Sequence, residues 1–79
     1  MNELQHEILA QAKALSPSPE IIGSTTDLLL DGHLDSLAVV QLVQWIEEHL
    51  GVSIDAGDVT IEHFGTVDDI VRFLESRSS

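Results

Sequence analysis

Residues 35–51 read DSLAVVQLVQWIEEHLG, and this stretch decides the fold. Its apolar side chains recur at the three- and four-residue spacing of an amphipathic helix, so we predict a helix over residues 36–50. Gly51 follows in the usual helix-stop position. At 100° per residue, one stripe of this helix collects the side chains that we assign to the core: Val39, Leu42, Val43, Ile46 and Leu50.

The segment before this helix predicts a first helix and a long loop. Residues 3–15 repeat the helical spacing, with Asn2 as a candidate cap. Pro17 and Pro19 end the helix, because proline disfavours the helical conformation of the residue before it. A connection of about twenty residues follows, a length that is uncommon in compact domains and often functional. We expect aliphatic side chains to pin it to the core: Ile21, Ile22, Leu28, Leu29 and Leu30.

The segment after residue 51 predicts two further helical pieces. We expect a short helical turn near residues 58–63 and a last helix capped by Thr66, with Asp69 placed as in a capping box. Residues 76–79 should fray. The predicted fold class is all-α: a small bundle of three main helices plus one short helix, with the long loop between helices one and two. Residues 1–79 would form a single domain.

Composition limits the function. Fourteen acidic residues against three basic ones give a formal charge of −11, so nucleic acid is not expected as a partner. The excess serves solubility or docking to basic patches on partner proteins. The chain has no cysteine, hence neither a disulfide framework nor a thiolate metal site. No stretch approaches the roughly 18 apolar residues of a membrane span, and no secretory signal is seen. We therefore expect a cytoplasmic monomer that binds no membrane.

Ser36 is the candidate functional residue. Serine often caps helices, but Asp35 can take that position and leave the Ser36 hydroxyl pointing outward. Leu37 and Val40 lie on the exposed side of the helix, where contact with a partner explains them better than burial. Acidic residues ring the same surface and favour the docking interpretation of the charge. The candidate partner-binding residues are Asp35, Leu37, Val40, Glu47 and Glu48.

Catalysis and metal binding are both disfavoured. A triad of Ser36, His33 and a nearby aspartate would need a sheltered site with an oxyanion hole, which a short acidic turn does not offer. The four histidines form no i, i+4 pair of the zinc type. Three acids repeat every four residues without the glycine and terminal glutamate of a calcium loop, namely Asp27, Asp31 and Asp35. We predict neither catalytic residues nor a metal site.

Taken together, these motifs resemble those of acyl carrier proteins over nearly the whole chain. The resemblance rests on Leu34-Asp35-Ser36-Leu37 at the start of helix two, the acidic pair Glu47-Glu48, and the segment 65–70 (GTVDDI) that opens the last helix. It implies a phosphoprotein: a phosphopantetheinyl transferase would attach 4′-phosphopantetheine from coenzyme A to Ser36. Acyl groups would then ride as thioesters on the terminal thiol. Loading enzymes and downstream synthases with basic docking patches would be the other partners.

The resemblance leaves the cargo open. Gln41 and Gln44 stand where carriers of fatty-acid synthesis often have an acid and an apolar residue, and no Gly-Gly precedes Ser36 as in many peptidyl carriers. The segment that leads to Ser36, residues 29–36, is similar to the same segment in free-standing carriers of secondary-metabolite pathways and in D-alanyl carriers. Our first hypothesis is an acyl carrier of polyketide or other specialised biosynthesis. The alternatives are an aminoacyl carrier, D-alanyl or peptidyl in type, and an unmodified acidic interaction module.

Overall fold

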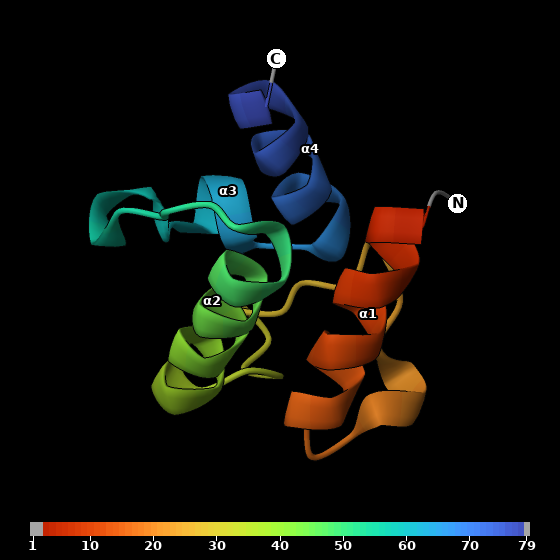
Figure 1. Ribbon diagram of the computed structural model, residues 1–79. Coiled ribbons are helices and arrows are strands. Elements are labelled where there is room, and N and C mark those ends of the chain that lie inside the picture. Colours follow the sequence, from red (N-terminus) through yellow and green to blue (C-terminus); the bar gives the residue numbers. More distant parts are fainter. Residues whose placement is uncertain (1–2, 79) are drawn as a thin grey trace.

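Helices are the only regular elements in residues 3–78, the part of the chain that the computed structural model describes. The all-α prediction is therefore confirmed, and the first two predicted helices have the expected bounds (Figure 1). Two 3₁₀ turns, η1 and η2, accompany the four α-helices. In chain order the elements are α1 (Glu3–Leu15), η1 (Pro19–Ile21), α2 (Ser36–Leu50), η2 (Ala56–Asp58), α3 (Ile61–Phe64) and α4 (Val67–Ser78).

Three long helices enclose the core. Helix α1 packs against both α2 and α4, while the short α3 packs against α4 (Figure 1). Each long helix contributes at least two buried aliphatic side chains, and Phe64 is the largest of the fully buried side chains. The central members of the core are Ile8, Ala12, Leu42, Ile46, Val67 and Ile70.

The inward face of α2 differs from the predicted stripe. Ala38, Leu42 and Ile46 are buried, whereas Leu50 is 38% exposed. Val39 and Val43 are only half-buried. The predicted stripe was therefore rotated by about 60° around the helix from the true one. The reason is that Val39 and Val43 face an open hollow shared with residues 54–59, so they are covered incompletely.

Caps fix the ends of the helices as the sequence indicates. Gly51 ends α2 in the left-handed conformation, at φ 67°, and its N–H donates to the Glu47 carbonyl at 2.9 Å. The Thr66 hydroxyl accepts from the Asp69 N–H at 3.0 Å and so caps α4. The proposed cap at Asn2 lies outside the described residues.

Helix α4 continues through Ser78, so the expectation that the chain frays from Ser76 was wrong over residues 76–78. Its last turn has side-chain support. The Arg77 guanidinium lies 5.6 Å from the centre of the Phe73 ring and 3.7 Å from an Asp58 carboxylate oxygen.

The α1–α2 connection (residues 16–35) is pinned by fewer of the predicted side chains than expected. Ile22 and Leu28 are buried, but Ile21 and Leu30 are 56% and 64% exposed. Ile21 belongs to η1, a turn that we did not predict, and Leu30 lies in the turn between Leu28 and Leu34, whose backbone groups are hydrogen-bonded at 3.1 Å. Both positions point away from the core because a tight turn exposes the residues at its tip.

Candidate functional site

Ser36 is the first residue of α2, and Asp35 is its N-cap. The Ala38 backbone N–H donates to Asp35 Oδ1 at 2.8 Å, as a capping aspartate requires. Ser36 is exposed, and its hydroxyl makes no hydrogen bond within residues 3–78. The cap and the exposed hydroxyl thus belong to two different residues, as the sequence predicted.

The surface next to Ser36 is apolar. Leu37 is 65% exposed and Val40 is 51% exposed. Both side chains therefore lie on the outside of α2 within its first two turns, where the sequence placed them. Their exposure has no structural benefit to the folded chain, since burying such side chains is what stabilises a fold.

A shallow hollow of about 480 Å³ lies beside Ser36, lined by the serine, by Asp35 and by aliphatic side chains of α2 and of the segments before and after it. Val39 and Val59 also line a second hollow of about 250 Å³ further along α2, so the two adjoin. We call this second hollow the α2 groove. Its apolar lining comes from α2 and from the α2–α3 connection (residues 51–60): Val39, Val40, Val43, Ile54, Ala56 and Val59.

The two glutamates of α2 have different surroundings. Glu48 is exposed, whereas Glu47 is half-buried and its Oε2 accepts from the Ile54 backbone N–H at 2.8 Å. Sequence reasoning missed this contact because the two residues belong to different elements and have no motif in common. Glu47 lies about 16 Å along the helix axis from Ser36, on the same side of α2.

The histidines do not converge on the serine. His49 Nε2 lies 2.9 Å from a Glu7 carboxylate oxygen, and His63 Nδ1 lies 3.1 Å from the Asp58 carbonyl. Among the described residues no hydrogen bond links His33 to Ser36, and no three His, Asp or Glu side chains gather as metal ligands. The arrangement around Ser36 therefore offers an exposed hydroxyl without a base hydrogen-bonded to it.

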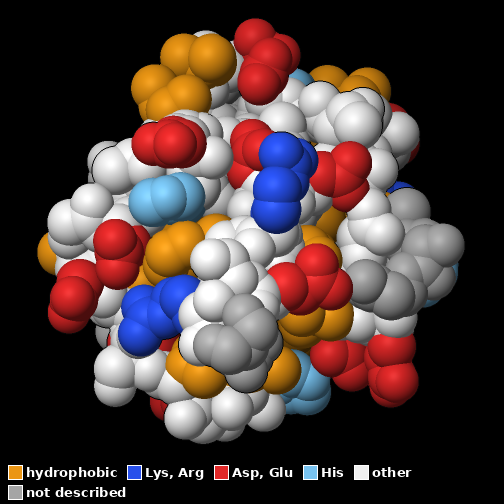
Figure 2. Space-filling model, turned by 90° about the horizontal axis from the view of Figure 1, so that it is seen from above, with side chains coloured by type: hydrophobic (Ala, Val, Ile, Leu, Met, Phe, Trp, Pro, Cys, Tyr) orange, Lys and Arg blue, Asp and Glu red, His pale blue; other side chains and the backbone are white. Residues whose placement is uncertain are grey.

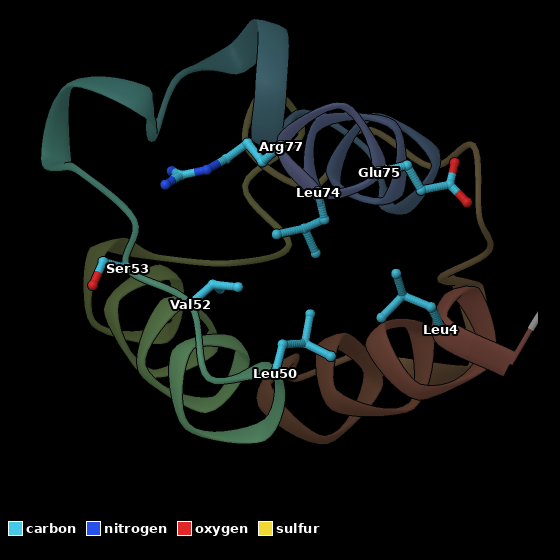
Figure 3. A pocket seen from close by; sticks show the side chains of 7 residues that line it. All are labelled: Leu4, Leu50, Val52, Ser53, Leu74, Glu75 and Arg77. Atoms are coloured by element: carbon cyan, nitrogen blue, oxygen red, sulfur yellow. The ribbon is translucent and has the colours of Figure 1, made fainter. Parts of the chain in front are cut away.

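Another hollow, of about 410 Å³, lies at the opposite end of α2. Figure 3 shows Leu4, Leu50 and Leu74 pointing toward one another across it, from α1, α2 and α4. Leu50 is fourteen residues from Ser36, or about 21 Å along the helix. This hollow is therefore separate from the surface around the serine.

Acidic side chains are not confined to that surface, since α1 and α4 also carry them. Figure 2 shows them spread over the face seen from above, with hydrophobic patches between them and few basic side chains. The acids of α2 and of the residues before it are part of this general excess.

The model of the family "Phosphopantetheine attachment site" matches residues 6–74. The chain belongs to this family. It is 31% identical to a D-alanyl carrier protein of Enterococcus faecalis over 74 residues, which cover 92% of this chain and 95% of the relative. It is also 35% identical to an acyl carrier protein of Thermosynechococcus vestitus over 78 residues, with 92% and 94% covered.

Membership makes the protein a carrier whose prosthetic group is covalently attached 4′-phosphopantetheine. The structure suits such a group: at the capped start of α2, Ser36 has an exposed hydroxyl that makes no hydrogen bond within residues 3–78, and a hollow lies next to it. When attached, the group supplies the thiol that this cysteine-free chain lacks. Carriers of this family work with phosphopantetheinyl transferases and with loading and synthase enzymes, and are in general not catalysts themselves. Within residues 3–78, none of the helices is long and apolar enough to span a bilayer.

Proposed function

We propose that Ser36 carries the phosphopantetheine arm and that the protein is a non-catalytic acyl carrier of polyketide or other specialised biosynthesis. The observation that supports this most is that, at the start of α2, one residue caps the helix and the next one has the exposed hydroxyl. Asp35 satisfies the helix N-terminus, so the Ser36 hydroxyl has no structural task. Its oxygen is the atom that would form the phosphodiester bond to the arm.

The lining of the α2 groove favours an apolar acyl cargo. Val39, Val43, Ile54 and Val59 line it, Gln44 is its one polar side chain, and none of the described residues that line it is a carboxylate. The ammonium group of an aminoacyl cargo would lose its hydration there without gaining a charged partner. An acyl chain would bury apolar surface instead.

An aminoacyl cargo is the second candidate, and the D-alanyl carrier among the relatives supports it. A small aminoacyl group at the end of the arm need not enter the groove at all. The protein charged with its arm should therefore be offered to adenylating enzymes with fatty acids and with amino acids. Preferential loading with an amino acid would replace the acyl proposal by this one.

The proposed partner surface surrounds Ser36. Leu37 and Val40 would be the apolar anchors, while Asp35, Glu47 and Glu48 would attract basic residues on a transferase, a loading enzyme or a synthase. The cytoplasmic location and the monomeric state expected from the sequence stay predictions.

Incubation with coenzyme A and a broad-specificity phosphopantetheinyl transferase tests the attachment. Mass spectrometry should show the addition of one arm, and peptide mapping should place it on Ser36 and on none of the other serines. The chain offers internal controls in Ser24 and Ser53. An unmodified protein, under conditions that modify an established carrier, would contradict the proposal, as would an arm on another serine.

A further inference from the structure

Glu47 differs from the other acids near the proposed partner surface in what its side chain contacts. Its Oε2 accepts a hydrogen bond of 2.8 Å from the Ile54 backbone N–H, seven residues along the chain. Its backbone carbonyl also accepts from the N–H groups of Gly51 and Val52, at 2.9 and 3.2 Å. Within residues 3–78, the side chain of the neighbouring Glu48 has no hydrogen bond or ion pair.

The contact joins α2 to Ile54, a residue that lines the α2 groove, although Glu47 itself is not part of that lining. Ile54 is 9% exposed and lines the groove from the α2–α3 connection, together with Ala56 and Val59. Figure 1 shows this connection, in green to teal, reaching outward from the end of α2 before it returns to α3. The Glu47 carboxylate therefore joins the helix that forms one wall to the segment that forms the other.

The far end of the connection is held by different groups. Asp58 lies 3.7 Å from the Arg77 guanidinium of α4, and its carbonyl lies 3.1 Å from His63 Nδ1 of α3. Helix α3 in turn packs against α4. Within residues 3–78, the hydrogen bonds between this connection and α2 lie at its near end, at the Gly51 cap and at Glu47.

We infer that Glu47 is a positioning residue, whose carboxylate holds Ile54 and thereby keeps the α2–α3 connection as the outer wall of the groove. A hydrogen bond from a neutral donor to a carboxylate is stronger than one between neutral groups, so one such bond can hold this segment. The inference rests on the proposed function, in which a cargo attached at Ser36 contacts the groove. It also distinguishes Glu47 from Glu48, whose proposed role is limited to attracting basic residues on a partner.

Two substitutions at each glutamate separate these roles. Glu47→Gln removes the charge but keeps a carbonyl oxygen that can accept from Ile54, whereas Glu47→Ala removes both. Glu48→Gln and Glu48→Ala are the matched controls. All four variants keep the backbone bonds that end α2.

Hydrogen exchange of the Ile54 amide, followed by NMR on the unmodified protein, gives the direct readout. In Glu47→Ala we expect the exchange to accelerate by about 10- to 100-fold, the factor that corresponds to losing a hydrogen bond to a charged group. In Glu47→Gln the acceleration should be several-fold smaller, and in both Glu48 variants it should stay within about twofold. Unchanged exchange in Glu47→Ala, or equal acceleration in Glu48→Ala, would overturn the inference.

A second readout separates groove positioning from simple stability. The transferase is supplied with octanoyl- or acetyl-coenzyme A, and the unfolding temperature of each loaded protein is measured. We expect the octanoyl form to be the more stable in the wild type and in Glu47→Gln, with the difference reduced in Glu47→Ala. An undiminished difference in Glu47→Ala would contradict the positioning role. If no arm attaches, the proposed function fails, while the exchange experiment still decides the inference.

Discussion

The two connections that flank α2 are held in different ways, although both line the hollow beside Ser36. The long α1–α2 connection is held from inside, by the buried side chains of Ile22, Leu28 and Leu34. The shorter α2–α3 connection has one buried aliphatic, Ile54, with Val52 and Val59 half-buried against the core, and it adds a hydrogen bond to a glutamate and an ion pair. Length is thus a poor guide to how firmly a loop is fixed, because buried apolar area contributes more than exposed polar contacts.

Truncating the main anchor of each connection gives the largest expected effects. Leu28→Ala should lower the free energy of unfolding by about 3–4 kcal/mol, because Leu28 is fully buried. Ile54→Ala should cost about 2 kcal/mol, since Ile54 lies at the edge of the core and borders an open groove. Urea denaturation measures both. Equal losses would show that the two connections are held equally firmly.

Gly65 links the long connection to the third helix and offers the next test. Its carbonyl accepts from the Leu28 N–H at 2.7 Å, and an added Cβ would lie 2.4 Å from the Ile61 carbonyl oxygen. The Gly65→Ala variant should therefore lose about 1–3 kcal/mol of stability, because backbone atoms must shift. Gly57→Ala is the control, since nothing lies within 4 Å of the Cβ it would add. Similar unfolding midpoints for the two variants would contradict the crowding at Gly65.

The sequence predicted the elements better than the connections. Helix bounds and caps follow from local signals, and Asp35, Gly51 and Thr66 behave as their residue types indicate. The exposure of Ile21 and Leu30 depends on turns within the long connection, which aliphatic character alone does not reveal. For the same reason the inward face of α2 was misplaced, because its neighbours decide which side is covered.

In the candidate site, too, the sequence predicted what depends on adjacent residues and missed what depends on contacts between distant ones. Asp35 as cap and Ser36 as an exposed hydroxyl follow from adjacent residues, and the sequence predicted both. The Glu47–Ile54 bond and the groove need the path of the connection in space, which spacing along the chain does not give. The contact between Glu7 and His49 was missed for the same reason, because the two residues lie far apart in the sequence and meet only where α1 packs against α2.

Charge on the proposed partner surface should have smaller, salt-dependent effects. Glu48→Lys should slow arm attachment several-fold at low ionic strength, because exposed charges mainly steer association. Val40→Ala should weaken binding at any salt concentration, since apolar anchors act mainly on dissociation. Initial rates of transfer over a salt series measure both effects.

Glu3→Lys is the matched charge control, as Glu3 is exposed on the first turn of α1. Glu7 is unsuitable, because its reversal would break the contact with His49. If Glu3→Lys slows attachment as much as Glu48→Lys, the total charge of the protein would be responsible, and the local surface would not.

The separation of tasks between Asp35 and Ser36 is the central claim, and one paired measurement tests it most directly. For Ser36→Ala and Asp35→Ala, both arm attachment and the free energy of unfolding are measured on the same preparations. We predict that Ser36→Ala takes no arm and stays within about 0.5 kcal/mol of the wild type in stability. Asp35→Ala should lose about 1 kcal/mol with its cap and still accept the arm on Ser36, but more slowly, because Asp35 also belongs to the proposed partner surface. An arm on Ser36→Ala, or a loss of stability in that variant equal to that of Asp35→Ala, would contradict the account.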